Sequence, residues 1–169
     1  MGSVTSDIHD PGKLLGDREL IRAGMLFTGA AAAPLPDRVI EITDGIVTGI
    51  ALAGEAGEQE DAHFDIVAPG FIDLQINGAG GVLFNDAPNE GTLRNMISAA
   101  QIGGTCHMLP TFITASGNAY REAMAAVAAF SGSEVLGLHL EGPFLSPDKP
   151  GIHPKDAIRK IANDDIRAL

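Results

Sequence analysis

The chain has 169 residues, of which 45% are apolar and 20% are charged, and its formal net charge is −11. This composition is typical of a folded protein, and the negative charge argues against nucleic acid or an anionic membrane as a partner. The single cysteine, Cys106, excludes an internal disulfide framework and indicates a reducing compartment, so we expect a cytoplasmic protein.

The first part of the chain predicts a flexible terminus followed by short strands. Residues 1–17 are polar and interrupted by glycine and proline. Residues 19–52 contain brief apolar runs, and Thr43-Asp44-Gly45 predicts a hairpin between the last two runs. We therefore assign residues 18–66 to a small β domain and residues 67–169 to a second domain.

The second domain shows strands alternating with helices. Strands are predicted by FDIVAPGFIDLQING (residues 64–78), TCHMLPTFIT (residues 105–114) and EVLGLHLEG (residues 134–142). Helices are predicted around Leu93–Ala100 with Gly103-Gly104 at the end, over residues 118–130 with Asn118 as N-cap, and from near Lys155. This alternation predicts βα units with parallel strands.

Two α/β architectures fit this alternation, a doubly wound open sheet and a (β/α)₈ barrel. The glycines of NGAGG do not have the G-x-G-x-x-G spacing of a dinucleotide site. Polar residues close the first and third strands, which favours a barrel, because barrels carry function at the carboxyl ends of their strands. A barrel takes about 250 residues, so we expect only the first three βα units, in an amino-terminal piece of a longer protein.

Asp73, Gln75 and Asn77 are expected to share one face of the first strand, because side chains alternate between faces. Many metal-dependent hydrolases carry His-x-His at this position, whereas neutral amides are poor zinc ligands. Gln75 and Asn77 thus indicate either a site reduced to one metal ion, with the amides holding water or substrate, or hydrogen-bonding residues at a strand end.

Glu141 is the strongest metal-ligand candidate. A carboxylate in an apolar segment is costly unless it is paired or binds a metal, so it is either a zinc ligand or part of a structural ion pair. His139, two residues earlier, is expected to have a structural or supporting role. Cys106 and His107 are expected to be a packed cysteine and a hydrogen-bonded histidine.

His153 lies in the sequence KPGIHP, in a loop above the predicted barrel strands. Such loops often carry function, and His153 with the nearby Lys149 could reach a phosphate or a sugar hydroxyl. The alternative is an exposed loop histidine without a role.

The quoted strands resemble the N-acetylglucosamine-6-phosphate deacetylases of the amidohydrolase superfamily. APGFIDLQINGAGGVLFND, GTCHMLPTFIT and GLHLEGPFLSPDKPGIHP occur in the family's order and spacing, and HLEGPF with the downstream G-x-H-P is the most specific part. The resemblance runs from about Arg22 onward. It implies a small β-sandwich domain beside a (β/α)₈ metal-dependent hydrolase barrel.

The resemblance also implies an activity, which is removal of acetate from N-acetylglucosamine 6-phosphate by metal-activated water. It assigns Glu141 as a ligand of a divalent ion, with zinc expected and iron or another ion as alternatives. Gln75 and Asn77 would occupy a degenerate metal motif, and Ile152 and His153 would contact the sugar. Two further histidines and the general-base aspartate are expected beyond Leu169, so no catalytic residue is assigned within this chain.

The expected partner is therefore a phosphorylated amino sugar, with a homodimer as the expected full-length assembly. We expect the 169-residue chain by itself to be an incomplete and inactive fragment. The alternatives are a non-catalytic product and an amidohydrolase that acts on a different amide.

Overall fold

The computed structural model describes residues 18–30, 33–55 and 60–169. The contacts divide the chain into two compact units, one ending at Pro69 and the other running from Gly70 to Leu169. The flexible terminus predicted for residues 1–17 lies outside the described residues. Within the described ranges, no helix is long and apolar enough to cross a membrane.

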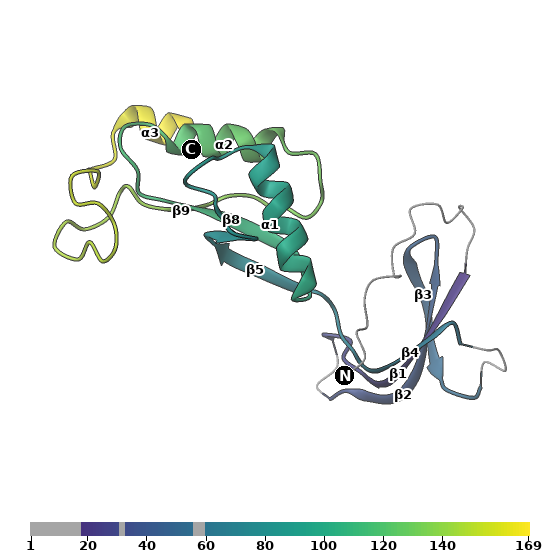
Figure 1. Ribbon diagram of the computed structural model, residues 1–169. Helices are drawn as coiled ribbons and strands as arrows, with labels where there is room; N and C mark the ends of the chain where they lie inside the picture. Colours follow the sequence, from purple (N-terminus) through teal and green to yellow (C-terminus); the bar gives the residue numbers. More distant parts are fainter. Residues whose placement is uncertain (1–17, 31–32, 56–59) are drawn as a thin grey trace. The chain divides into compact units, whose positions relative to one another are not determined.

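The first unit is a four-stranded sheet in the order β3-β2-β1-β4 (Figure 1). Its strands are β1 (Arg18–Leu26), β2 (Leu35–Thr43), β3 (Ile46–Leu52) and β4 (Ala62–Val67). Strands β1 to β3 pair antiparallel, and β4 pairs parallel to β1. The predicted hairpin is confirmed, because Asp44 and Gly45 connect β2 to β3 with φ of 53° and 74°, the positive values that a tight hairpin turn requires.

This sheet has a small apolar core around Ala23, Leu26 and Ile40. Several large apolar side chains of β3 are exposed: Ile46, Val47, Ile50 and Leu52. The described strands of this unit form one layer, so the second layer of the expected β-sandwich stays a prediction.

The second unit contains a parallel three-stranded sheet in the order β5-β8-β9. The strands are β5 (Phe71–Ile76), β8 (Thr105–Ile113) and β9 (His139–Glu141), and the helices are α1 (Glu90–Ile102), α2 (Tyr120–Ala129) and α3 (Asn163–Ala168). A short hairpin of β6 (Gly78–Ala79) and β7 (Val82–Leu83) lies between β5 and α1. The predicted α/β alternation with parallel strands is confirmed, while the sheet formed by the described residues is open and does not close into a barrel.

Helix α1 forms as its sequence predicts. The side chain of Asn89 accepts a hydrogen bond from the backbone N–H of Thr92 at 3.0 Å and caps the first turn. Leu93 and Met96 are fully buried on the face toward β8, in one cluster with Met108. Figure 1 shows α1 lying across this sheet. The apolar contact with α1 holds β8, which is the central strand of this sheet.

The prediction of a single strand over residues 64–78 is wrong. This segment forms β4 of the first sheet and β5 of the second, separated by Ala68-Pro69-Gly70. Pro69 has no N–H to donate to a ladder. A side chain at Gly70 would collide with the side chain of Cys106, which explains glycine at the start of the second unit.

Three other boundaries differ from the prediction. The strand expected over residues 134–142 is reduced to β9 and one bridge between Val135 and Met108, because Gly137 weakens the ladder between them. Asn118 is not the N-cap of α2, which begins after Ala119 without a side-chain cap. The last helix begins at Asn163 rather than near Lys155.

The late start of α3 has a local cause. The Asp165 carboxylate accepts the backbone N–H of Ala162 at 2.8 Å and so fixes the start of the helix. The preceding residues therefore remain loop.

Candidate active site at the carboxyl end of the parallel sheet

Polar side chains from four segments meet where the parallel strands end. Gln75 lies near the end of β5, Thr114 directly follows β8, Glu141 closes β9, and His153 belongs to the long loop between β9 and α3 (Figure 1). The parallel register places the end of β8 beside Glu141. We call these four residues the carboxyl-end cluster.

Glu141 lies at the centre of this cluster. Its Oε2 accepts a hydrogen bond from Nε2 of Gln75 at 2.9 Å, and its Oε1 lies 3.4 Å from Nε2 of His153. The Glu141 side chain is 33% exposed. No arginine or lysine of the described segments forms an ion pair with it. Glu141 thus contacts an amide and an imidazole, rather than an arginine or a lysine.

His153 is part of the cluster and is not an exposed loop histidine. Its side chain is 8% exposed, and its Nδ1 lies 2.9 Å from Oγ1 of Thr114. Thr114 is itself buried, and its backbone N–H donates to the carbonyl of Glu141 at 3.0 Å. One threonine therefore contacts both the loop histidine and the backbone carbonyl of Glu141.

Two residues of this arrangement were not identified from the sequence. One is Thr114, and the other is Asn85, which follows β7. The side-chain amide of Asn85 accepts from the backbone N–H of Ile113 at 2.8 Å and donates to its carbonyl at 3.0 Å. Asn85 thereby pairs with the last residue of β8, beyond the point where β5 pairs with that strand. The sequence signal was weak, because Thr114 is the last residue of the predicted strand 105–114 and Asn85 lies in no predicted element.

The predicted face of Asp73, Gln75 and Asn77 is only partly regular. The carboxylate of Asp73 accepts the backbone N–H of Gln75 at 3.0 Å, and the pairing of β5 with β8 shifts register between Asp73 and Ile76. Asn77 lies beyond β5, where its carbonyl accepts the N–H of Phe84 at 2.9 Å. Within the described part of the chain, the amide side chain that bonds to Glu141 is that of Gln75 and not that of Asn77.

His139 and Ile152 lie close in sequence to this cluster but do not join its hydrogen bonds. Nδ1 of His139 lies 3.1 Å from Oγ1 of Thr111, a contact between neighbouring strands that suits a structural role. The side chain of Ile152 is 86% exposed. Its contact with a sugar stays a prediction.

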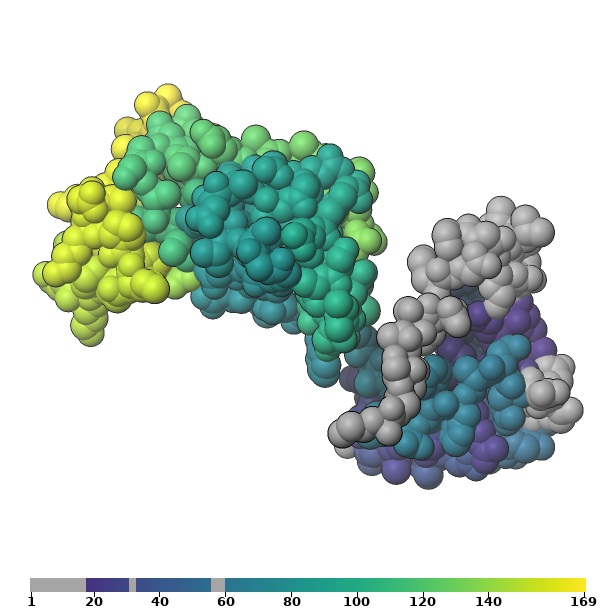
Figure 2. Space-filling model, viewed as in Figure 1, coloured from purple at the N-terminus to yellow at the C-terminus, as the bar shows by residue number. Residues whose placement is uncertain are grey.

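The loop that carries His153 is anchored at its far end by a buried carboxylate. Asp165 is 3% exposed and accepts two hydrogen bonds from Arg159, at 2.6 and 2.7 Å, and one from the Tyr120 hydroxyl at 2.7 Å. These hydrogen bonds, first of all those from Arg159, hold the pKa of Asp165 far below its usual range. The backbone N–H of Arg159 also donates to the carbonyl of Pro143 at 3.1 Å, which joins the two ends of the loop. Figure 2 shows this segment at the surface of the second unit.

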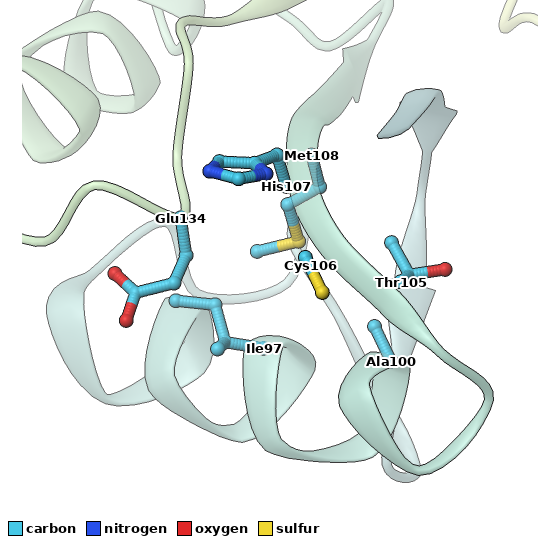
Figure 3. A pocket seen from close by; sticks show the side chains of 7 residues that line it. All are labelled: Ile97, Ala100, Thr105, Cys106, His107, Met108 and Glu134. Atoms are coloured by element: carbon cyan, nitrogen blue, oxygen red, sulfur yellow. The ribbon is translucent and has the colours of Figure 1, made fainter. Parts of the chain in front are cut away.

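A shallow hollow lies at the opposite end of β8. Figure 3 shows it between α1, the first residues of β8 and the segment before β9, with Cys106, His107 and Glu134 among its lining residues. We call this space the amino-end hollow. Cys106 is exposed, so the prediction of a packed cysteine is wrong.

A divalent ion fits the carboxyl-end cluster in part. Among the described residues, no group of three or more His, Cys, Asp and Glu side chains is arranged to hold a metal ion. Glu141 nevertheless offers a partly exposed carboxylate beside an imidazole, and carboxylate and imidazole are the donors that zinc prefers after thiolate. Glu141 is the residue of this cluster that would hold such an ion.

A carboxylate at the carboxyl ends of parallel strands, with polar groups from neighbouring loops around it, lies where α/β enzymes carry their active sites. The model of the amidohydrolase family matches residues 66–168, which include the whole carboxyl-end cluster. The chain therefore belongs to the amidohydrolase family.

Two relatives within this family have similar sequences. The chain is 40% identical over 130 residues to an N-acetylgalactosamine-6-phosphate deacetylase of Shewanella sp. (strain ANA-3), a match that covers 72% of this chain and 33% of the relative. It is 43% identical over 104 residues to an N-acetylglucosamine-6-phosphate deacetylase of Haemophilus influenzae, covering 60% of this chain and 27% of the relative. The chain thus spans about a third or less of the length of these relatives.

A solved structure gives the same comparison in three dimensions. The crystal structure of N-acetylglucosamine-6-phosphate deacetylase from Pasteurella multocida superposes with a TM-score of 0.73 at 28% identity. The match covers 88% of this chain and 41% of that structure. The chain is therefore homologous to amino-sugar-phosphate deacetylases over nearly all of its own length.

Proposed function

We propose that this chain supplies the metal-binding carboxylate and part of the sugar-binding surface of a deacetylase that acts on N-acetylglucosamine 6-phosphate. The products would be glucosamine 6-phosphate and acetate. The observation that carries the proposal is the meeting of Gln75, Glu141 and His153 at the carboxyl end of the sheet, where Oε2 of Glu141 accepts from Gln75 and Oε1 faces His153. The homology to deacetylases supports the substrate class.

Gln75, Glu141 and His153 have separate parts in this proposal. Glu141 would hold a divalent ion, and Gln75 would orient that carboxylate through the hydrogen bond to Oε2. His153 would accept or donate a hydrogen bond at a sugar hydroxyl, and Asn77 and the exposed Ile152 would border the sugar. When bound, the ion supplies the Lewis acidity that activates water for attack on an amide.

The proposal assigns the two other metal ligands, the general base and the closure of a (β/α)₈ barrel to residues that this sequence does not contain. We therefore expect the 169-residue chain to release no acetate. Metal-dependent acetate release by the purified chain would contradict this assignment.

N-acetylgalactosamine 6-phosphate is a second candidate substrate, because a relative that is 40% identical carries that name. The two sugars differ only in the configuration of one ring hydroxyl. A site that recognises that hydroxyl distinguishes them, whereas one that recognises only phosphate and acetamide does not.

Binding to the 169-residue chain tests the proposal directly. Ligand-observed NMR would be recorded with N-acetylglucosamine 6-phosphate, N-acetylgalactosamine 6-phosphate and glucose 6-phosphate, each with and without zinc. We expect the acetylated sugars to bind more tightly than glucose 6-phosphate, and His153→Gln to weaken that preference. Equal signals for all three sugars, or a preference that survives His153→Gln, would show that the cluster does not recognise the amino sugar.

A further inference from the structure

A cluster of side chains lies where the loop that carries His153 begins and ends. Its members come from α2, from the segment after β9, from the end of the loop and from α3, and they are Tyr120, Phe144, Arg159 and Asp165. We call this cluster the loop clasp. Tyr120 and Asp165 are buried in it. The clasp thus joins both ends of the loop to the two helices.

The contacts of the clasp form a closed circle. Arg159 donates to both carboxylate oxygens of Asp165, and the hydroxyl of Tyr120 donates to the same carboxylate. The ring of Tyr120 meets the ring of Phe144 edge-on, with centroids 6.1 Å apart. The guanidinium carbon of Arg159 lies 5.0 Å from the centroid of the Phe144 ring. Arg159 therefore contacts the start of the loop and α3 at the same time.

Between these two ends, the loop makes its own local turns. The backbone N–H groups of Lys149, His153 and Ala157 each donate to the carbonyl three residues earlier, at 3.0 to 3.2 Å. Among the described residues, the hydrogen bond that joins residues 145–158 to a group outside the loop is the one between His153 and Thr114. Local turns shape the loop but do not place it on the sheet. The clasp and His153 are therefore its polar attachments.

Arginine is the basic residue that suits both contacts of Arg159. Its planar guanidinium binds a carboxylate through two N–H groups and also stacks on an aromatic ring, whereas the lysine ammonium is a point charge on a flexible stem. Arg159→Lys therefore keeps the charge opposite Asp165 but loosens the geometry. This substitution separates the position of the loop from its charge.

We propose that Arg159 is a positioning residue, which through the loop clasp holds His153 beside Glu141, where the imidazole meets a hydroxyl of the sugar. This inference rests on the proposed function for the identity of the ligand. The attachment of the loop does not depend on that function. Two measurements therefore test the two parts separately.

Trypsin measures the attachment of the loop. Lys155 is exposed within the loop, so cleavage after it reports opening of the loop, whereas cleavage after Arg94 on α1 reports unfolding of the helix. We expect Arg159→Lys to speed cleavage after Lys155 about fivefold relative to cleavage after Arg94, the factor that loss of one hydrogen bond gives. A ratio equal to that of the unaltered chain would overturn the inference.

Sugar binding measures the use of this attachment. N-acetylglucosamine 6-phosphate is titrated with zinc present, and we expect Arg159→Lys to weaken its binding about fivefold. Arg94→Lys is the matched control, because Arg94 also pairs with a carboxylate, that of Glu90, and also lies over an aromatic ring, that of Phe130. It should change the affinity less than about twofold. Equal losses in the two variants would overturn the positioning claim.

The His153→Gln background separates positioning from stability. If Arg159 acts through His153, Arg159→Lys should change the sugar affinity of the His153→Gln chain less than about twofold, because coupled residues are not additive. Cleavage after Lys155 should still become faster in that chain. An equal loss of sugar affinity with and without His153 would show that Arg159 does not act through this ring, and would overturn the proposal.

Tyr120→Phe replaces Arg159→Lys if that variant does not fold. It removes one hydrogen bond of the clasp and keeps the rings, so the same directions of change are expected. If the unaltered chain binds no sugar phosphate, the proposed function fails together with the sugar part of this inference. The trypsin ratio then still decides whether the clasp holds the loop.

Discussion

The two ends of β8 carry similar kinds of side chain in different arrangements. The amino-end hollow contains a thiol, an imidazole and a carboxylate, and the described structure records no hydrogen bond among Cys106, His107 and Glu134 (Figure 3). In the carboxyl-end cluster, groups from separate segments are joined through Glu141 and Thr114. The comparison teaches that suitable residue types can line a hollow without being linked, whereas the proposed site consists of linked polar groups.

The largest effect is expected from removing the central carboxylate. Glu141→Gln should remove zinc binding at the carboxyl-end cluster, because Glu141 is the side chain of this cluster assigned to hold the ion. Isothermal titration of zinc into the 169-residue chain measures this change. Glu134→Gln at the amino-end hollow is the matched control and should change the affinity less than about twofold. A larger loss of zinc affinity in Glu134→Gln than in Glu141→Gln would place the metal at the amino-end hollow and contradict the proposal.

The next largest effect is expected from the anchor of the loop. The pKa of Asp165 is held well below its usual 3.8, so its contribution to stability is complete above that value and is lost as the pH falls through the lower folded-state value. We expect Asp165→Asn to lower the free energy of unfolding at pH 7 and to flatten its decline below about pH 4. Urea unfolding at pH 7 and at a pH below about 4 measures the free energy of unfolding of both chains.

The control for that experiment is Asp156→Asn, an exposed carboxylate in the same loop. It should keep the stability of the unaltered chain at pH 7. If Asp165→Asn and Asp156→Asn have the same free energy of unfolding at pH 7, the loop is not anchored by Asp165.

A smaller effect is expected at the end of β8. Asn85→Ala leaves the N–H and the carbonyl of Ile113 without their side-chain partner, at a cost of about 1–3 kcal/mol in the free energy of unfolding. Asn95→Ala, an exposed position on α1, should cost less than about 0.5 kcal/mol. Chemical denaturation of both variants measures the difference. Equal losses of stability would show that the hydrogen bonds of Asn85 with Ile113 do not stabilise the end of β8.

The smallest effect is expected at the amino-end hollow. His107→Gln should change the affinity for zinc and for N-acetylglucosamine 6-phosphate less than about twofold, because the hollow takes no part in the proposed site. Titration and ligand-observed NMR measure the two affinities. A loss larger than that of His153→Gln would reverse the comparison between the two ends of β8.

Local sequence patterns predicted the regular elements that depend on near neighbours. The spacing of Leu93, Met96 and Ile97 identified α1, and Asp44-Gly45 identified the hairpin, because helix faces and tight turns are set within a few residues. Such patterns could not show that the run around Pro69 divides between two sheets, since each half has the composition of a strand.

The candidate site was predictable only where a residue type was unusual for its surroundings. Glu141 stood out as a carboxylate in an apolar segment, and the structure places it at the centre of the polar cluster. Thr114 and Asn85 are ordinary residues in sequence, and their contacts are with residues 27 or more positions away. Asp165 has one such distant partner, Tyr120, which is 45 positions earlier, besides the nearby Arg159 and Ala162. Partners so distant cannot be read from spacing along the chain.

The position of a bound zinc ion tests the central claim most directly. Crystals of the 169-residue chain grown with zinc would be measured at the zinc absorption edge, where anomalous scattering locates the ion. We predict a peak at about 2.0–2.2 Å from a carboxylate oxygen of Glu141. A peak among Cys106, His107 and Glu134, with none beside Glu141, would contradict the account.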